Sequence, residues 1–309
     1  MQAGQAIRVE PGIYDAQNTV TTSGTADAPI TIQADSGSGP VLISGVAHAF
    51  DVSAASHIVI SGFDIGVTTG ESVLISDSSD VTIQKFVINN IFDGGLSFGN
   101  DQIHVTGASS GIDISQNVIA KSTTTAVQID AGGSGDTVTT NILGDIEGDA
   151  IDVDSTPGTT IVSNTIDDTC GRSIAMTGTS TGATIENNIL EDTSGSGIAL
   201  SCATPGPDFA GLVVEATATS GTVENYNDVV TAEDAVEDYN WAGTPYATAA
   251  ALYAAIGQGA ADYGNSSVLG EFSLSLLPTT GSTQNVEVYN NSTGTTDLIT
   301  DVLGYFAAD

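Results

Sequence analysis

Between Asp101 and Cys202, one apolar-x-apolar triplet recurs every 23 or 24 residues. The triplets are Ile103-His104-Val105, Val127-Gln128-Ile129, Ile151-Asp152-Val153, Ile174-Ala175-Met176 and Ile198-Ala199-Leu200. Their apolar positions are two residues apart, which is the side-chain period of a strand; a helix would need spacings of three and four. A second segment keeps the same spacing: Ile114-Asn117-Ile119, Val138-Asn141-Leu143, Ile161-Asn164-Ile166 and Ile185-Asn188-Leu190. Each repeat therefore predicts at least two short strands joined by Gly, Ser, Thr and Asp turns.

A constant repeat of this length predicts a solenoid, in which each coil pairs in parallel with the next at a spacing of about 4.8 Å. The apolar columns would then form continuous stacks inside a tube. The asparagines of the second segment would form an inward ladder, because a buried amide needs partners and the next coil supplies them. These are Asn117, Asn141, Asn164 and Asn188.

This pattern resembles the right-handed parallel β-helix of the pectate-lyase-like kind, in which asparagine ladders recur. The opening, Ala6-Ile7-Arg8-Val9-Glu10-Pro11-Gly12-Ile13-Tyr14 followed by Gly24-Thr25-Ala26-Asp27-Ala28-Pro29-Ile30-Thr31-Ile32, is similar to that of secreted β-helix proteins related to chondroitin and alginate lyases. The resemblance implies an all-β fold, a single-stranded right-handed parallel β-helix over residues 1–230. It also implies a secreted, extracellular protein, although the sequence shows no signal peptide. Few residues precede the first strand, so we expect the amino-terminal end of the tube to be thinly capped.

The columns extend backwards through Val73 and Ile75 to Phe50 and Val52. In these coils the ladder position holds Phe63 and Phe86, which predicts an aromatic stack that gives way to asparagine at Asn117. About seven extra residues lie within 89–100, including Phe92 and Phe98. They predict either a tolerated surface loop or the wall of a groove in which a phenylalanine stacks on a sugar.

Residues 231–309 are predicted to form a carboxy-terminal cap and a β-rich tail. Tyr239-Asn240-Trp241-Ala242-Gly243-Thr244-Pro245-Tyr246 and the Gly-Gln-Gly-Ala sequence at 257–260 resemble the cap of secreted bacterial β-helix proteins, with Trp241 in the cap core. Residues 247–256 between them are rich in Ala and predict one short helix that ends at Gly257. The segments 286–292 and 301–306 alternate like two strands and are similar to a β module of secreted actinobacterial proteins.

The chain carries 4 Lys and Arg against 38 Asp and Glu, for a net charge of −34. A nucleic-acid surface needs clustered cations, so nucleic acid is an unsuitable partner, and anionic membranes are disfavoured for the same reason. No apolar run is long enough to insert into a membrane. The acidic surface is explained either by solubility or by binding of calcium. The only two cysteines, Cys170 and Cys202, lack metal or redox spacing and predict a disulfide, with two free thiols as the alternative.

Polar residues occupy the outward positions of three consecutive triplets. His104, Gln128, Asp130, Asp152 and Asp154 would share one surface of the tube. Two carboxylates on one strand, or on neighbouring strands, have separations that suit a glycosidase, and His104 could act as a base. Asp130 and Asp154 could equally hold calcium. Alternatively, all of these are ordinary solvated strand residues.

Three functions remain open at this stage. The first is an extracellular β-helix that engages a polysaccharide, as a lyase or a glycosidase, with Gln128, Phe92 and Phe98 binding the sugar. The resemblance argues against a lyase, because such enzymes use a Lys or Arg base and none lies at the outward positions of the triplets; Lys121 and Arg172 lie in turns. The second is a structural or adhesive β-helix that self-associates end to end into a fibre. The third is a calcium-stabilised scaffold.

Overall fold

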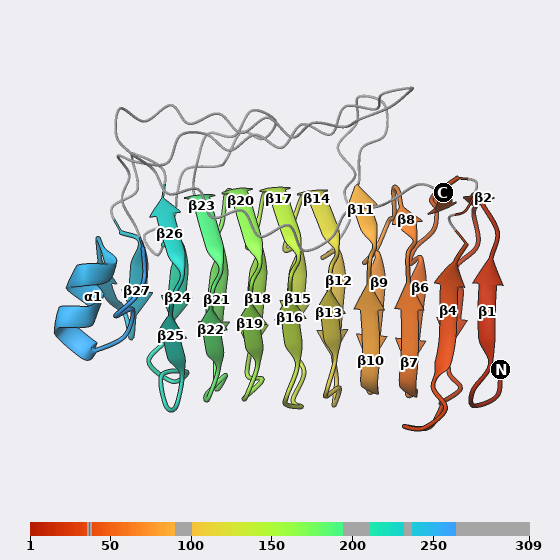
Figure 1. Ribbon diagram of the computed structural model, residues 1–309, viewed down its shortest axis with the longest axis horizontal. Coiled ribbons are helices and arrows are strands. Elements are labelled where there is room, and N and C mark those ends of the chain that lie inside the picture. The colour runs from red at the N-terminus through yellow and green to blue at the C-terminus, as the bar shows by residue number, and fades with distance from the viewer. Residues whose placement is uncertain (36, 38, 90–100, 194–209, 232–236, 264–309) are drawn as a thin grey trace. The chain divides into compact units, whose positions relative to one another are not determined.

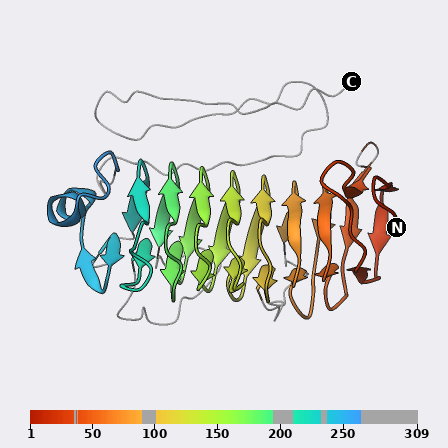
Figure 2. The same cartoon turned by 90° about the horizontal axis from the view of Figure 1, so that it is seen from below.

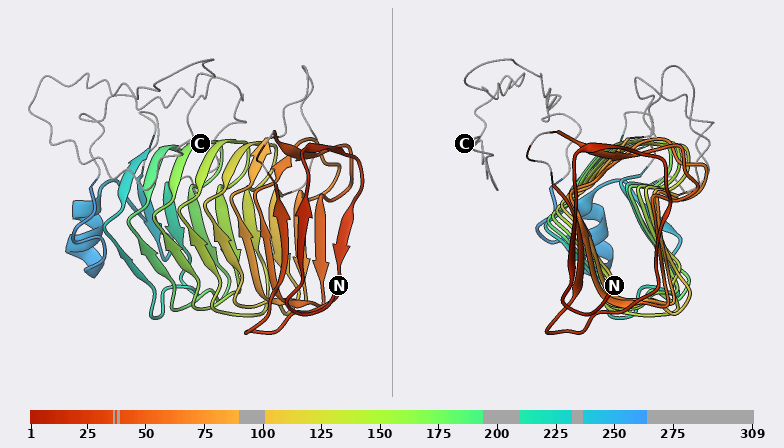
Figure 3. Two further views of the ribbon diagram at one scale, coloured as in Figure 1. Left: turned by 45° about the vertical axis from the view of Figure 1, so that its right-hand side comes forward. Right: turned by 90° about the vertical axis from the view of Figure 1, so that its right-hand side faces the viewer.

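The structure is a computed structural model and describes residues 1–35, 37, 39–89, 101–193, 210–231 and 237–263. These residues form three parallel β-sheets and one short helix (Figure 1). This architecture confirms the predicted parallel β-helix. Viewed along its axis, successive coils follow nearly the same outline (Figure 3). None of the helical segments in the described ranges has the length and apolar character needed to span a bilayer.

Each sheet contains one strand from every coil, and sheet C ends in an additional strand, β28, which pairs antiparallel with β27. Sheet A consists of β1 (Ala6–Val9), β4 (Ile30–Ala34), β7 (Ser56–Ser61), β10 (Ser79–Gln84), β13 (Asp113–Ser115), β16 (Thr137–Thr139), β19 (Thr160–Val162), β22 (Thr184–Glu186) and β25 (Val223–Asn225). Sheet B consists of β2 (Gly12–Tyr14), β5 (Val41–Ile43), β8 (Asp64–Ile65), β11 (Val87–Asn89), β14 (Val118–Ser122), β17 (Ile142–Ile146), β20 (Thr165–Thr169), β23 (Ile189–Thr193) and β26 (Asp228–Thr231). Sheet C consists of β3 (Asn18–Val20), β6 (Phe50–Ser53), β9 (Val73–Ser76), β12 (Ile103–Thr106), β15 (Val127–Ile129), β18 (Ile151–Asp154), β21 (Ile174–Thr177), β24 (Leu212–Val214), β27 (Tyr239–Trp241) and β28 (Thr244–Tyr246).

The second segment of each repeat contains two strands and a corner. β13 ends at Ser115, β14 begins at Val118, and between them Gln116 has a left-handed φ of 58°. Equivalent corners follow at Thr140, Ser163, Asn187 and Tyr226, with φ values of 55°, 61°, 57° and 61°. None is a glycine, although glycine tolerates this conformation best. Each coil therefore has three strands, one in each sheet.

The predicted asparagine ladder is confirmed. Asn117, Asn141, Asn164 and Asn188 are each 1% exposed, and they occupy the first position after the corner. The Oδ1 atom of Asn141 accepts from the backbone N of Asn117 at 2.9 Å and from its Nδ2 at 3.0 Å, and the same pair of bonds links every later step. The ladder extends one coil further, to Asn227, which accepts from Asn188 at 2.9 Å.

The predicted aromatic stack is also confirmed. The ring centroids of Phe63 and Phe86 are 5.8 Å apart, and Phe50 from sheet C packs within 4.9 Å of Phe63. All three rings are buried in a core that otherwise consists mainly of Ile, Val and Ala. The backbone N of Phe86 donates to Asn117 Oδ1 at 2.9 Å, so the aromatic coils and the ladder meet directly.

The prediction that Ile198 and Leu200 follow Ile174 and Met176 in the sheet C columns is wrong. β21 pairs with β24, in the register Ile174 to Leu212 and Met176 to Val214. Leu212-Val213-Val214 has the same apolar character as the earlier triplets, and it enters the sheet after a longer connection than the repeat suggests. Ile198, Leu200 and Cys202 lie outside the described residues.

The predicted cap helix is present as α1 (Ala249–Ile256). Thr248 Oγ1 accepts from Ala251 N at the start of the helix, and Gly257 ends it in the left-handed conformation with φ 77°. Trp241 is 7% exposed and belongs to the core, as predicted. Met1–Gly264 forms one compact unit. The tail segments 286–292 and 301–306 lie outside the described residues, so the division at 230/231 stays a prediction.

Candidate functional site

The outer face of sheet C presents three columns of polar side chains, because the alternate residues of each strand point into the core. The middle column follows the strand register through His104, Gln128 and Asp152, with the apolar Leu74 before them and the buried, apolar Ala175 after them. A second column lies two residues further along the chain and includes Thr106, Asp130, Asp154 and Thr177. A third column lies in the turn before each strand: His48, Glu71, Asp101, Thr125, Asp149 and Arg172.

His104 lies at the centre of one cluster on this face. Its Nε2 atom is 3.0 Å from Asp130 Oδ1 on the following coil. Its Nδ1 atom is 3.8 Å from Glu71 Oε1 and 3.9 Å from Asp101 Oδ2. Burial raises the pKa of Asp101, and the charge of His104 acts in the opposite direction. The imidazole is therefore enclosed by carboxylates from three coils.

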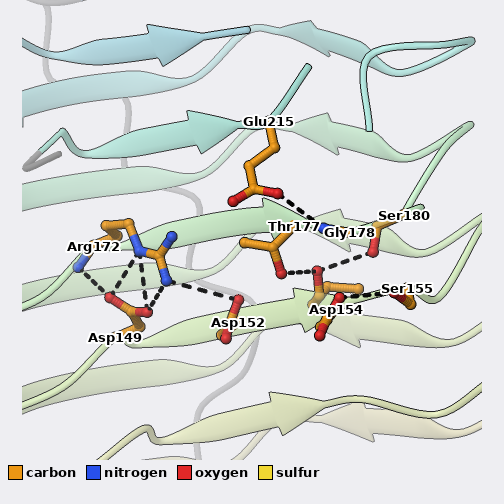
Figure 4. Close-up of polar contacts among 10 residues, drawn as sticks. Asp149, Asp152, Asp154, Ser155, Arg172, Thr177, Gly178, Ser180 and Glu215 are labelled. Atoms are coloured by element: carbon orange, nitrogen blue, oxygen red, sulfur yellow. Dashed lines mark hydrogen bonds and ion pairs between the residues drawn. The ribbon is translucent and has the colours of Figure 1, made fainter. Parts of the chain in front are cut away.

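Arg172, three coils further along, lies at the centre of a second cluster (Figure 4). Its Nε atom is 3.1 Å from each carboxylate oxygen of Asp149, and its Nη2 atom is 2.5 Å from Asp149 Oδ2. The same Nη2 atom lies 4.0 Å from Asp152 Oδ1. Burial alone would lower the pKa of Arg172, but the hydrogen bonds and charge of Asp149, with further charges nearby, raise it. The guanidinium therefore stays protonated.

Of the carboxyl groups on this face, Asp152 has the most strongly raised pKa. Its side chain is 18% exposed, and its buried Oδ1 atom has no hydrogen-bond partner within the described chain. Burial raises the pKa of Asp152 to about 6, and the charges of Asp149 and Asp154 act in the same direction. The charge of Arg172 and a hydrogen bond from Gln128 oppose this shift without cancelling it. Asp152 is thus half protonated near pH 6, where an ordinary aspartate is ionised.

Asp154 lies two residues further along β18 and is held differently. Its Oδ1 atom accepts from Ser155 Oγ at 2.8 Å. On the neighbouring coil, the backbone N of Gly178 donates to Glu215 Oε2 at 3.0 Å. Gly178 has a φ of 58°, and a Cβ atom there would displace Asp154 Oδ1 and Ser155 Oγ, so glycine is favoured beside this carboxylate (Figure 4).

The structure brings the residues predicted from the sequence onto one face. His104 contacts Asp130, and Gln128 contacts Asp152. Phe92 and Phe98 lie outside the described residues. Cys170 is buried and directly follows β20. Cys202 lies outside the described residues, so the disulfide stays a prediction. In the described ranges, no three His, Cys, Asp or Glu side chains converge well enough to hold a metal ion. Calcium at Asp130 and Asp154 therefore stays a prediction that the described carboxylates do not favour.

Arg172, Asp149, Glu71 and Asp101 were not predicted as site residues, because only the outward positions within and just after each triplet were considered. A signal was present: Asp101, Thr125, Asp149 and Arg172 are separated by 24, 24 and 23 residues, the same spacing as the apolar columns. Arg172 does lie in a turn and not at an outward position of a triplet, but its side chain extends to within 4.0 Å of Asp152 Oδ1 on the outward face.

A family model described as the right-handed β-helix region matches residues 48–212. The chain belongs to the right-handed β-helix family. Among solved structures, this β-helix protein is similar to an alginate lyase from Paenibacillus sp. str. FPU-7, with 16% identity and a TM-score of 0.64, over 85% of this chain and 89% of the lyase.

Two further structures are more distant. The pectate lyase Pel9A has 11% identity and a TM-score of 0.44, over 78% of this chain and 62% of that one. The GH136 lacto-N-biosidase from Eubacterium ramulus has 11% identity and a TM-score of 0.36, over 85% and 61%. No curated protein sequence matches this β-helix protein. At sequence identities this low, the structural similarity establishes the fold and nothing further.

Proposed function

We propose that this β-helix protein is an extracellular protein that binds a polysaccharide along the outer face of sheet C and hydrolyses it, with Asp152 as the general acid. The observation that carries the proposal is the raised pKa of Asp152, about 6, at the centre of a polar face. A glycosidic bond breaks when an acid protonates the departing oxygen, and this acid must hold its proton near the working pH. An alginate lyase with the same fold supports a polysaccharide as the partner.

Asp154 supplies the second carboxylate that hydrolysis requires. It follows Asp152 by two residues on the same strand, which places the two Cα atoms about 6.5 Å apart on one face. Carboxyl groups about 6.5–9.5 Å apart leave room for a water molecule and favour inversion at the anomeric carbon. In this mechanism Asp154 removes a proton from the water while Asp152 protonates the leaving oxygen.

The arrangement favours hydrolysis over elimination. Elimination from a uronic acid needs a base for the ring proton and a cation beside the sugar carboxylate. Arg172 is protonated and already pairs with Asp149 through both carboxylate oxygens, so it is available for neither task. The carboxylates of Asp130 and Asp154 would repel a uronate. A neutral polysaccharide therefore suits this face best, with His104, Gln128 and Asp130 available to bind sugar hydroxyl groups.

The test is an assay of neutral and uronate polysaccharides that measures new reducing ends and, separately, the ultraviolet absorbance of new carbon–carbon double bonds. We expect reducing ends without double bonds, and a kcat/KM that falls about tenfold per pH unit above pH 6. Asp152→Asn and Asp154→Asn should each lower kcat by about 100-fold or more. Asp51→Asn is the matched control, because Asp51 lies in the same column on a distant coil.

Other results would point elsewhere. Double bonds in the product would identify a lyase. Binding without cleavage, unchanged by Asp152→Asn, would support the structural or adhesive alternative. Calcium is a separate proposal: if Asp130 and Asp154 bind it, calcium should raise the melting temperature of the wild type and leave that of the Asp130→Asn, Asp154→Asn double variant unchanged.

A further inference from the structure

The two ends of the tube differ in how their strand edges are covered. At the carboxy-terminal end, the backbone N of Gly259 donates to Glu224 O at 3.0 Å, and Tyr263 N donates to Asn227 O at 2.8 Å, so residues 257–263 cover the last strands of sheets A and B. β28 covers β27 in sheet C by antiparallel pairing. Figure 2 shows α1 at this end of the described coils and β1 at the other.

At the amino-terminal end, β1 is the outermost strand of sheet A. The carbonyl groups of Gln5 and Val9 accept from Thr31 N and Asp35 N in the next coil, at 3.0 and 2.8 Å. Because these groups alternate along a strand, the N–H and C=O groups of Ala6, Arg8 and Glu10 point away from β4.

The outward-pointing edge of β1 is open in the described chain. Ala6, Ile7 and Arg8 are exposed, and Ile7 reaches 39%. The preceding residues bend the other way, since Gly4 N donates to Ala28 O at 2.9 Å. Of the described residues, only Tyr14 contacts a polar atom on this edge, where its hydroxyl donates to Glu10 O at 2.8 Å and leaves that oxygen a second lone pair.

We propose that two copies of this chain form a head-to-head dimer, in which β1 pairs antiparallel with β1 of the second copy. An open strand edge is a template for such pairing. The register follows from the charges. With Val9 on the two-fold axis, Arg8 faces Glu10 of the second copy twice, and both residues carry the outward-pointing N–H and C=O groups that an antiparallel pair exchanges. Placing Arg8 on the axis would instead bring two arginines together.

The same topology argues against an end-to-end fibre. A fibre needs an open edge at each end of the molecule, so that one end can pair with the opposite end of the next copy. At the carboxy-terminal end, residues 257–263 cover the edges of sheets A and B. Sheet C ends there in β28, a three-residue strand whose central Pro245 has no N–H to donate, which makes it a poor template for a further strand. Two amino-terminal edges can still meet across a two-fold axis, and that contact closes after two copies.

Sedimentation velocity on the full chain tests the dimer, with charge variants as probes. Arg8→Glu and Glu10→Arg each place like charges opposite one another, and each should weaken dimerisation about tenfold or more. The double variant Arg8→Glu, Glu10→Arg restores the pairing and should dimerise like the wild type. Asp27→Arg is the matched control, because it makes the same charge change as Glu10→Arg on an exposed turn.

Hydrogen exchange locates the contact. In the dimer, the amides of Arg8 and Glu10 should exchange slowly, and in the Glu10→Arg variant they should exchange quickly. A monomeric wild type would overturn the proposal; if those amides were nevertheless protected, another segment of the chain would cover the edge. Filaments, or a dimer that neither single variant weakens, would overturn it as well.

Discussion

The coils around Phe63 and Phe86 and the coils from Asn117 onward fill the same interior corner with different chemistry. The phenylalanines contact one another through rings 5.8 Å apart and offer no hydrogen bonds. In the asparagine coils, each Oδ1 atom after that of Asn117 accepts two hydrogen bonds from the preceding coil. The phenylalanines therefore stabilise neighbouring coils only through van der Waals contact. Each ladder asparagine also forms hydrogen bonds with polar groups of the coils on both sides.

The largest effect expected from this difference is at Asn164, in the middle of the ladder. Asn164→Leu leaves Asn141 N, one Asn141 Nδ2 hydrogen and Val138 O without their partners in a buried site. Each buried unsatisfied group costs about 1–3 kcal/mol, so the free energy of unfolding should fall by about 5 kcal/mol. Urea denaturation measures it.

Asn18→Leu is the control from the aromatic half of the tube. Asn18 is half-buried and donates from Nδ2 to Ala16 O and Ala49 O at 3.2 and 3.0 Å. Water can replace its bonds, so we expect a loss of about 1 kcal/mol or less. Equal losses at Asn18 and Asn164 would contradict the idea that the ladder links its members.

The next effect concerns Asn227, the last member of the ladder, which donates a hydrogen bond to a buried carboxyl group. Asn227 Nδ2 donates to Glu224 Oε1 at 3.0 Å, and Glu224 is 1% exposed. Burial raises the pKa of Glu224 well above its ordinary value of 4.5, and a hydrogen bond and charge from Asp262 raise it further. The folded protein then holds a proton that the unfolded chain releases. Stability is full below pH 4.5 and declines as the pH rises toward the folded pKa.

Glu224→Gln should remove this decline, because the amide is neutral at every pH. The informative range lies above about pH 7, where Asp152 and Asp228, both with pKa values of about 6, are almost fully ionised. We expect the urea midpoint of the wild type to fall with pH in this range and that of the variant to stay nearly flat. Parallel curves for the two proteins would show that Glu224 is ionised in the fold.

The sequence alone predicted the interior of the tube well, for a physical reason. In a parallel stack, equivalent residues of successive coils lie directly above one another, so a fixed spacing in sequence becomes a column in space. Phe63, Phe86 and Asn117 could therefore be assigned to one stack before any coordinates. The outward columns followed from the same spacing, which placed His104, Gln128 and Asp152 on one surface.

Two features escaped this reasoning. The corners at Gln116 and Thr140 are ordinary residues in a left-handed conformation, so no glycine or proline marks the boundary between two strands. Arg172 reaches the candidate site through a long side chain from a turn, and alternation along a strand does not predict how far such a side chain extends. The perturbed pKa of Asp152 depends on this arginine and on burial, and neither is visible in the spacing.

The boundary between the two regions gives a sharper test. Phe86→Asn and Phe63→Asn remove the same buried ring, and each should cost about 3–5 kcal/mol for the lost packing. An asparagine at 86 would lie next to Asn117, whose Oδ1 atom now accepts a single hydrogen bond, from Phe86 N. An asparagine at 63 would lie next to Phe86, which offers no acceptor. Phe86→Asn should therefore be the more stable variant by about 1–2 kcal/mol in urea denaturation. Equal stabilities would show that the ladder cannot be extended.

The smallest effect lies at the corners themselves. The corner before Phe63 is Gly62, with φ 81°, whereas Lys85 before Phe86 and Thr140 before Asn141 are not glycines and have φ values of 59° and 55°. A β-branched residue in this conformation is strained, so Thr140→Gly should stabilise the protein by up to about 1 kcal/mol, less the loss of its hydrogen bond to Thr139 O. Gly62→Thr is the reciprocal change, and it should destabilise by a similar amount, because a Cβ atom at 62 has room, with Ala34 Cβ 3.5 Å away, and only the backbone strain remains. Thermal unfolding of both variants checks the pair. If Thr140→Gly destabilises, the ladder bonds of Asn141 need a stiff corner, and the two halves of the tube differ in their backbone as well as in their side chains.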